Sequence, residues 1–364
     1  MSSVVFMLGN EGEIPQAKQP GFFTERDVLA GHNSTSTNAG NSTNEVTITM
    51  PQPRCSDQLK FWSENVQNKI PKSILKKLSP LSKTDIDYYS NIISKNGNKF
   101  SADANFCSHA KLACTSLLNN ARTVTNTYTT TKTYPANSAS FRRANKNNED
   151  PFSFFRLAIL ENGNLVHLPN LHESLPDRAF LPPQIASTIP LTYQGITKVF
   201  PELSAGVGQE TIQTTLSLCE AEEIQGEMKS CPKSLEEMVG FAKFALGGKR
   251  LFALSSENTK GSNTVVMIKH VKKYAAEKIV ACHEAFLPFA AYFCHSLSST
   301  RLYAVDLVDR ETGASVNNMV AICHMDTSPW PENHVAFQIL KFGPGEGEAC
   351  HWFTQIDLAW IGIE

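Results

Sequence analysis

Residues 278–295, KIVACHEAFLPFAAYFCH, carry the pattern that decides the fold of this 364-residue chain. The segment contains two runs rich in β-branched and aromatic residues, KIVACH and AAYFCH, and each run ends in a Cys-His dipeptide. Such runs, bounded by turns, predict two β-strands. Because neighbouring side chains of a strand point to opposite faces, each dipeptide sends its sulfur to one face and its imidazole to the other.

Two further Cys-His dipeptides, Cys323-His324 and Cys350-His351, complete a set of four, with 10, 27 and 25 residues between successive members. The set takes four of the nine cysteines and four of the ten histidines. Four such strands could gather cysteines on one face and histidines on the other. Paired cysteines form disulfides in an oxidising compartment, and clustered imidazoles bind copper or zinc. A mixed Cys/His zinc site is the weaker alternative, because structural zinc sites usually have ligand pairs two to four residues apart.

The rest of the C-terminal part is mostly strand. A capping box at Ser234 and Glu237 begins a helix that stops at Gly247-Gly248, and Asp309–Gly313 predicts a hairpin loop. Six runs predict strands, at residues 264–271, 278–283, 290–295, 301–309, 318–324 and 334–340. We therefore expect an α+β domain that is dominated by antiparallel sheet and contains a few helices.

The N-terminal part is more polar. Residues 32–47, HNSTSTNAGNSTNEVT, cannot bury enough apolar surface to offset their ordering entropy, which predicts flexibility. A helix is expected after Pro80, capped by Ser82 or Thr84. The chain then divides into a flexible N-terminal region, a small helical segment with cysteines, a polar linker and the sheet-dominated domain, at residues 1–56, 57–118, 119–150 and 151–364.

Charge and hydropathy argue against two classes of partner. The net charge of −2 argues against nucleic acid as a partner. No apolar run approaches the roughly 20 residues that span a bilayer.

The sequence features that bear on export from the cell conflict with one another. Asn33 and Asn41 lie in glycosylation sequons, which matter only in a secreted chain, whereas residues 1–15 lack the basic start and long apolar core of a signal peptide. Either the true N-terminus lies upstream of this chain, or the protein is not exported by that route.

The spacing CH-x10-CH-x27-CH-x25-CH, followed by Trp352, resembles the plant-specific BURP domain. The resemblance runs from the start of the predicted domain to the C-terminus. Other positions that agree with the family are Phe154-Phe155, Cys219 and Cys231, residues 322–330 (ICHMDTSPW) and Gly343-Pro-Gly345.

Within that family the chain is most similar to the non-catalytic β subunits of polygalacturonase. Residues 150–156, DPFSFFR, match the opening of that subgroup's domain, and Phe61-Trp62 and residues 106–114 agree upstream. Two departures stand out. The subgroup's array of Phe-x-x-Tyr repeats is essentially absent, with only the polar stretch 119–150 in its place, and residues 1–54 replace the expected signal peptide.

The resemblance implies a secreted, non-catalytic glycoprotein of the plant cell wall or apoplast. Such a protein would associate with polygalacturonase or pectin and influence pectin breakdown and cell expansion. The alternative is an enzyme, because some BURP proteins are copper-dependent peptide cyclases that join Trp or Tyr side chains of a core peptide. Residues 1–150 contain no repeated core peptide. A cysteine hydrolase fits poorly, since a Cys and a His adjacent on a strand point apart.

Site residues follow from the same resemblance, and copper is the candidate cofactor. The candidate metal ligands, which in the cyclase alternative are also the catalytic residues, are His283, His295, His324 and His351. Disulfides are expected between Cys107 and Cys114 and between Cys219 and Cys231. The pairing of Cys282, Cys294, Cys323 and Cys350 has three solutions, and Cys55 is left over.

Other conspicuous side chains have plainer interpretations. We expect surface or structural roles for the isolated histidines His167, His172 and His270. Stacking on sugars is conceivable for three tryptophans, but core positions explain them better: Trp330, Trp352 and Trp360.

Overall fold

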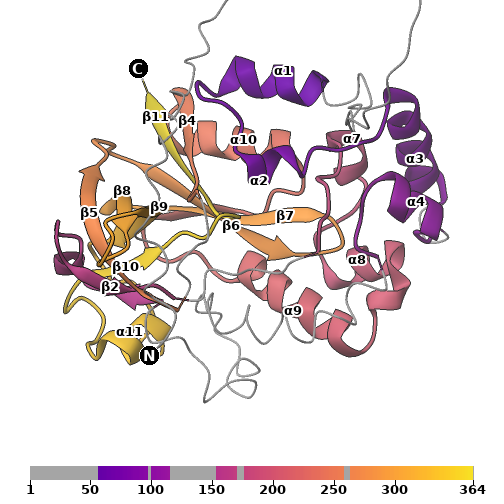
Figure 1. The fold of residues 1–364 in the computed structure, drawn as a ribbon. Helices are drawn as coiled ribbons and strands as arrows, with labels where there is room; N and C mark the ends of the chain where they lie inside the picture. Colours follow the sequence, from indigo (N-terminus) through magenta and orange to yellow (C-terminus); the bar gives the residue numbers. More distant parts are fainter. Residues whose placement is uncertain (1–55, 97–99, 115–152, 170–175, 258–262, 364) are drawn as a thin grey trace, which may run out of the picture. The chain divides into compact units, whose positions relative to one another are not determined.

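The computed structural model describes residues 56–96, 100–114, 153–169, 176–257 and 263–363, which all lie within the unit Pro51–Glu364. Their strands form two antiparallel sheets (Figure 1). The six-stranded sheet, in the order β1-β10-β9-β8-β5-β2, consists of β1 (Phe154–Phe155), β2 (Leu165–His167), β5 (Val265–Lys273), β8 (Thr300–Val308), β9 (Ser315–His324) and β10 (Ala349–Trp352). The five-stranded sheet, in the order β3-β7-β6-β11-β4, consists of β3 (Glu227–Ser230), β4 (Arg250–Leu254), β6 (Ile279–Phe286), β7 (Ala290–Leu297) and β11 (Leu358–Ile363). The predicted α+β class is confirmed.

The helices fall into two sets along the chain. The N-terminal set is α1 (Ser56–Asn65), α2 (Lys72–Leu75), α3 (Lys83–Asn96) and α4 (Ala104–His109). The second set is α7 (Pro183–Ala186), α8 (Tyr193–Val199), α9 (Gly206–Glu220), α10 (Leu235–Ala245) and α11 (Val335–Leu340), with 3-10 turns at Leu157–Ile159 and Pro201–Leu203. Within the described ranges, no helix combines the length and the apolar character that crossing a bilayer requires.

The two sheets pack face to face through an apolar layer. Because strand residues alternate between faces, β6 contributes Ile279 and Ala281 to this layer and Val280 and Cys282 to the opposite face. Phe353, fully buried between β10 and β11, lies in the same layer. The six-stranded sheet supplies Leu302, Val320 and Ile322. The space between the sheets is therefore part of the core.

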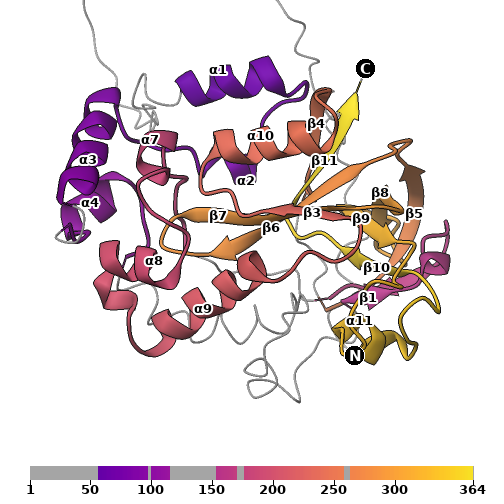
Figure 2. The same cartoon turned by 180° about the vertical axis from the view of Figure 1, so that it is seen from behind.

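Helix α10 covers the outer face of the five-stranded sheet, and α1 lies over α10 (Figures 1 and 2). The start and stop of α10 agree with the prediction. Ser234 Oγ accepts a hydrogen bond from Glu237 N at 3.1 Å, and the Glu237 carboxylate accepts from Lys233 N at 2.7 Å. Gly247 and Gly248 follow the helix with φ angles of 75° and 79°, which glycine adopts readily.

The N-terminal helices share their apolar core with the sheets. The ring centroids of Trp62 and Trp360 are 5.5 Å apart, and Phe106 packs in one cluster with residues of α7, α8 and α9. At the edge strand β4, Asn68 Nδ2 donates to Ala253 O at 2.7 Å and Ala253 N donates to Asn68 Oδ1 at 2.9 Å. The segment before α2 therefore covers a sheet edge that would otherwise expose unpaired backbone groups.

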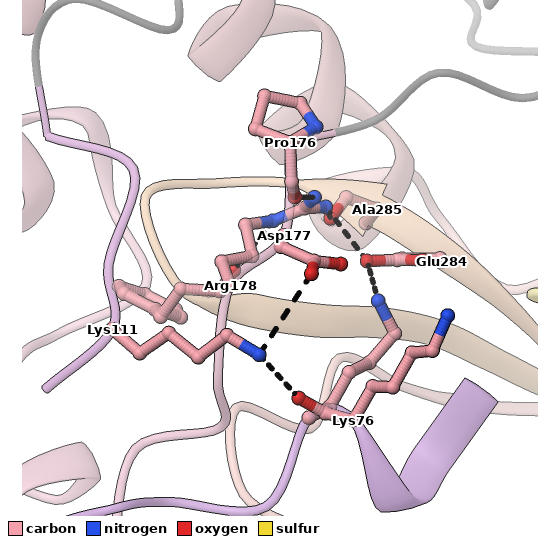
Figure 3. Close-up of polar contacts among 9 residues, drawn as sticks. Lys76, Lys111, Pro176, Asp177, Arg178, Glu284 and Ala285 are labelled. Atoms are coloured by element: carbon pink, nitrogen blue, oxygen red, sulfur yellow. Dashed lines mark hydrogen bonds and ion pairs between the residues drawn. The ribbon is translucent and has the colours of Figure 1, made fainter. Parts of the chain in front are cut away.

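A buried ion cluster joins the same two parts of the chain (Figure 3). Glu284 Oε1 on β6 accepts from Lys77 Nζ at 2.6 Å and lies 3.0 Å from Arg178 Nη2, and all three side chains are almost fully buried. Arg178 also donates to the backbone carbonyls of Pro176, Ala285 and Phe289. Burial lowers the pKa of Lys77, and the charge of Glu284 opposes this shift. These pairings partly offset the desolvation cost of the three charges, and loss of Glu284 would leave two buried cations without a counter-charge.

Five of the six predicted strand runs are strands, and the sixth is wrong. Residues 335–340 form α11 instead. His334 Nδ1 accepts from Ala336 N at 3.0 Å and caps this helix, and Lys341 ends it with a φ of 61°. A short apolar run has no periodicity that separates a strand from a helix, so the sequence pattern could not exclude the helix.

Candidate metal centre

The hairpin of β6 and β7 carries the first two Cys-His dipeptides. Cys282 and Cys294 lie directly opposite each other and form a disulfide, with their Cα atoms 4.0 Å apart. Both sulfurs lie on the outer face of the five-stranded sheet, in the apolar cluster that contains α10. Strand alternation therefore places His283 and His295 on the inner face, toward the six-stranded sheet.

Strands β9 and β10 repeat this arrangement in the six-stranded sheet. Cys323 and Cys350 are register partners joined by a disulfide, again with a Cα separation of 4.0 Å. These two pairings settle which of the three connectivities is present. The four cysteines do not share one face, as four strands of a single sheet would allow. They lie on two separate outer faces, because the four strands belong to two sheets.

The four imidazoles meet between the sheets, and we call this group the four-His cluster. Its members are His283, His295, His324 and His351. Successive ring centroids are 5.7 Å apart for His283 and His295, 6.0 Å for His295 and His324, 5.7 Å for His324 and His351, and 5.6 Å for His351 and His283. Three of the rings are buried, and His351 keeps some exposure. The structure thus brings together all four candidate ligands.

The donor set suits copper or zinc, because neutral imidazole nitrogen is a good ligand for both ions. In the described part of the chain, no group of three or more His, Cys, Asp or Glu side chains is already placed to hold an ion. With a zinc–nitrogen distance of about 2.0 Å, tetrahedral imidazoles would have ring centroids about 5 Å apart. The four successive centroid distances are all longer than this, so the rings must approach one another to bind an ion tetrahedrally.

Two carboxylates and one hydroxyl contact the cluster from outside. His283 Nδ1 lies 3.2 Å from Asp357 Oδ1, and His295 Nδ1 lies 3.2 Å from Glu227 Oε1. The third contact, from Thr300 Oγ1 to His324 Nδ1, measures 3.4 Å. These three residues were not among the predicted site residues. None belongs to a Cys-His dipeptide, and strand pairing and loop geometry, which the sequence does not display, bring them here.

Burial favours the neutral form of His324 and His351. Desolvation lowers the pKa of His324 well below 6.5 and that of His351 to about 3, and other histidines of the cluster add to both shifts. Burial by itself would raise the pKa of Glu227, but the hydrogen bond and charge of His295 lower it overall. Metal binding needs the neutral imidazole, and these two histidines are held in that form.

Aromatic rings line the cluster. The Trp330 ring centroid lies 5.1 Å from that of His324 and 4.1 Å from that of His334. Phe353 lies 5.2 Å from His283 in an edge-on arrangement. Stacking on sugars is not available to the three tryptophans considered above, because all are at most 7% exposed: Trp330, Trp352 and Trp360.

Every cysteine in the described ranges is in a disulfide, including the pairs Cys107–Cys114 and Cys219–Cys231. A cysteine hydrolase needs a thiolate, and this part of the chain offers none. His270 is exposed, and His167 is half-buried with Nδ1 3.0 Å from Leu168 O. The remaining candidates lie outside the described residues: Asn33, Asn41, Cys55 and His172.

Comparison with known proteins gives relatives that match about 60% of the chain. The chain is 36% identical over 225 residues to polygalacturonase-1 non-catalytic subunit beta of Solanum lycopersicum, covering 60% of this chain and 36% of the relative. It is 36% identical over 217 residues to polygalacturonase 1 beta-like protein 2 of Arabidopsis thaliana, covering 58% and 35%. With BURP domain-containing protein 12 of Oryza sativa subsp. japonica it shares 35% identity over 215 residues, covering 58% and 34%. The chain spans about a third of the length of these relatives.

Two family models match the chain. A domain of unknown function (DUF3403) matches residues 9–54, which lie outside the described residues. The BURP domain matches residues 153–362, more than half of the chain, and this stretch contains the four disulfide-backed histidines. The chain therefore belongs to the BURP domain family.

Proposed function

We propose that this protein is a non-catalytic component of the plant cell wall, of the polygalacturonase β-subunit type, which associates with polygalacturonase or pectin. In that role it would influence pectin breakdown and cell expansion. The observation that supports this is 36% identity, over 225 and 217 residues, with two proteins named as non-catalytic subunits of polygalacturonase. Four disulfides agree with a place in the apoplast, because disulfides persist in oxidising compartments.

Binding of the full chain to two immobilised partners tests this proposal. One partner is a purified polygalacturonase catalytic subunit and the other is homogalacturonan. We expect saturable binding to at least one of them by surface plasmon resonance. The chain after reduction and alkylation, which lacks its disulfides, serves as the control and should lose that binding. Absence of binding to both partners by the native chain would overturn the proposal.

A second candidate function is copper binding with cross-linking of peptide side chains. The observation that favours it is the four-His cluster, in which four imidazoles from two disulfide-linked strand pairs face one another. These histidines would hold the ion. If copper is bound there, it would relay in one-electron steps the two electrons that are lost, together with two protons, when Trp or Tyr side chains are joined, and dioxygen would be the terminal acceptor. The chain's part is to fix the imidazoles on paired strands and to surround them with apolar rings.

Peptide mapping by mass spectrometry, with and without copper, tests this second candidate. A copper-dependent loss of a pair of hydrogens from a Tyr- or Trp-containing peptide would support it. His283→Ala should abolish that change while the fold survives in thermal melting, whereas His270→Ala, at an exposed position, should leave it intact. If His283→Ala only destabilises the fold and the native chain shows no mass change with added peptides, the cluster is structural.

A further inference from the structure

The four imidazoles of the cluster have unequal surroundings. On the five-stranded sheet, His283 and His295 each have a carboxylate 3.2 Å from Nδ1. On the six-stranded sheet, His324 has the neutral hydroxyl of Thr300 at 3.4 Å. The charge of Asp357 reaches His351 through space and raises its pKa, against the larger effect of burial. The two histidines of the five-stranded sheet therefore each contact a carboxylate at Nδ1, whereas His324 on the six-stranded sheet contacts a neutral hydroxyl.

Asp357 is held in place independently of the imidazole that it contacts. Its Oδ2 accepts from Thr354 N at 2.8 Å and from Thr354 Oγ1 at 2.9 Å. The residue is only 1% exposed. The loop between β10 and β11 thus fixes one carboxylate oxygen on its own backbone and presents the other, Oδ1, to His283.

Glu227 reaches the cluster from the edge strand β3 in a similar way. Its Oε2 accepts from Ile224 N at 3.2 Å, and its Oε1 faces His295. Strand β3 pairs with β7, which carries His295, so the acid and the imidazole belong to neighbouring strands. The Glu227 side chain is 9% exposed, so solvent screens its charge only weakly.

A carboxylate at Nδ1 affects a metal-binding imidazole in two ways. It accepts the Nδ1 proton, which keeps the ring in the tautomer that binds metal through Nε2. It also places a negative charge close to the ion in a poorly screened environment. Two such acids offset the charge of a divalent ion, whereas with a monovalent ion they leave a net negative charge in the core.

We propose that Asp357 and Glu227 are positioning residues that make the four-His cluster a site for a divalent cation, Cu²⁺ or Zn²⁺, in preference to Cu⁺. The inference rests on the metal site of the second candidate function above. Imidazole donors alone do not create this preference, since they suit copper and zinc generally. The preference comes from the two acids, and it is absent from the Cys-His motif itself.

The test compares Asp357→Asn and Glu227→Gln with the native full chain, because each substitution keeps the side-chain shape and removes the charge. Affinities for Zn²⁺, Cu²⁺ and Cu⁺ are measured by competition with chelators of known affinity. We expect each variant to bind both divalent ions about 10–100-fold more weakly and Cu⁺ with a smaller loss. Each tenfold fall in the ratio of Cu²⁺ affinity to Cu⁺ affinity should raise the reduction potential of the bound copper by about 59 mV.

Glu236→Gln is the matched control, because Glu236 is a half-buried acid on α10 that contacts Gln58 and lies outside the cluster. It should leave all three affinities unchanged. Unchanged affinities in the two test variants, or equal losses for all three ions, would overturn the inference while leaving the metal site intact. A native chain that binds none of the ions would overturn the metal site and the inference together. Near-ultraviolet circular dichroism checks folding, and Glu227→Gln, on an edge strand, carries the test if Asp357→Asn fails to fold.

Discussion

Lys77 and Glu284 are 207 residues apart in the chain, yet Lys77 Nζ lies 2.6 Å from Glu284 Oε1 inside the protein. Glu284 directly follows His283 on β6, and its side chain points to the opposite face of the strand. The N-terminal helices are thereby tied to the strand that carries one of the four candidate ligands.

Glu284→Gln should lower the free energy of unfolding by about 3–5 kcal/mol, because it leaves Lys77 and Arg178 buried without a counter-charge. Lys77→Met should cost less, since Arg178 still pairs with Glu284. Urea unfolding followed by circular dichroism measures both changes. The exposed neighbour Lys76 (Figure 3) provides the control, and Lys76→Met should stay within about 0.5 kcal/mol of the native chain. Equal losses for Glu284→Gln and Lys76→Met would contradict a stabilising ion cluster.

The two cross-strand disulfides should differ in their contribution to stability. Cys323–Cys350 closes a separation of 27 residues, and Cys282–Cys294 closes one of 12. Replacing either pair by alanines should cost about 2–5 kcal/mol, with the longer loop costing about 0.7 kcal/mol more in the chain-entropy account. Guanidinium unfolding of the two double variants gives the comparison.

The pair Cys107–Cys114 serves as the reference for these disulfide variants, since its residues belong to the apolar cluster of the N-terminal helices. Its removal should lower stability and leave metal affinity unchanged, whereas removal of either cross-strand pair should weaken metal binding as well. Identical metal affinity in all three double variants would show that the disulfides do not hold the histidines in place.

The pH dependence of stability should include a contribution from His334, whose pKa is lowered to about 3 by burial. In the unfolded chain this group takes up a proton below about pH 6.5, but in the folded protein only near pH 3. Its stabilising contribution is therefore complete above pH 6.5 and is lost as the pH falls toward 3, at up to about 1.4 kcal/mol per pH unit.

His334→Asn tests that contribution, because asparagine is also a favoured helix N-cap and can keep α11 capped. Between pH 6 and 4, the unfolding free energy of the variant should fall less steeply with falling pH. The difference in slope should be the contribution of one proton, about 1.4 kcal/mol per pH unit. Chemical unfolding at a series of pH values measures the slope. The same slope in both proteins would show that His334 is not the titrating group.

Asn68→Ala should loosen the edge of the five-stranded sheet. It removes both hydrogen bonds to the backbone of Ala253 and should cost about 1–3 kcal/mol. Hydrogen exchange measured by mass spectrometry should show faster exchange in the β4 peptide, with β6 and β7 unaffected. Asn91→Ala, at an exposed position on α3, is the control and should leave β4 exchange unchanged.

The core of the candidate site could be predicted because its pattern is local. A Cys-His dipeptide on a strand has only one way to orient its two side chains, and the strand signals around Cys282 and Cys323 are strong. The N-terminal cap of α3 could also be predicted. Ser82 and Thr84 were the two candidates, and in the structure Asp85 N donates to Ser82 Oγ at 3.2 Å.

What could not be predicted depends on pairing between distant segments. The sequence does not show that β6 and β7 belong to one sheet and β9 and β10 to another, so the disulfide connectivity stayed open. The acids Asp357 and Glu227 have no local signature, because loop geometry and strand register bring them to the imidazoles. The strand predicted at residues 334–340 was wrong for a different reason: the run is too short for its periodicity to separate a strand from a helix, and the structure has a helix capped by His334.

The placement of a disulfide behind each pair of histidines has a consequence for the order of events in the life of the chain. Before oxidation, β9 and β10 are paired only by the hydrogen bonds of the sheet, and the Cys323–Cys350 disulfide then adds a covalent link beside His324 and His351. Metal capture at full affinity would then have to wait for disulfide formation. The redox state of the surroundings would then control metal uptake, and chains kept in reducing conditions would take up little metal until their disulfides form.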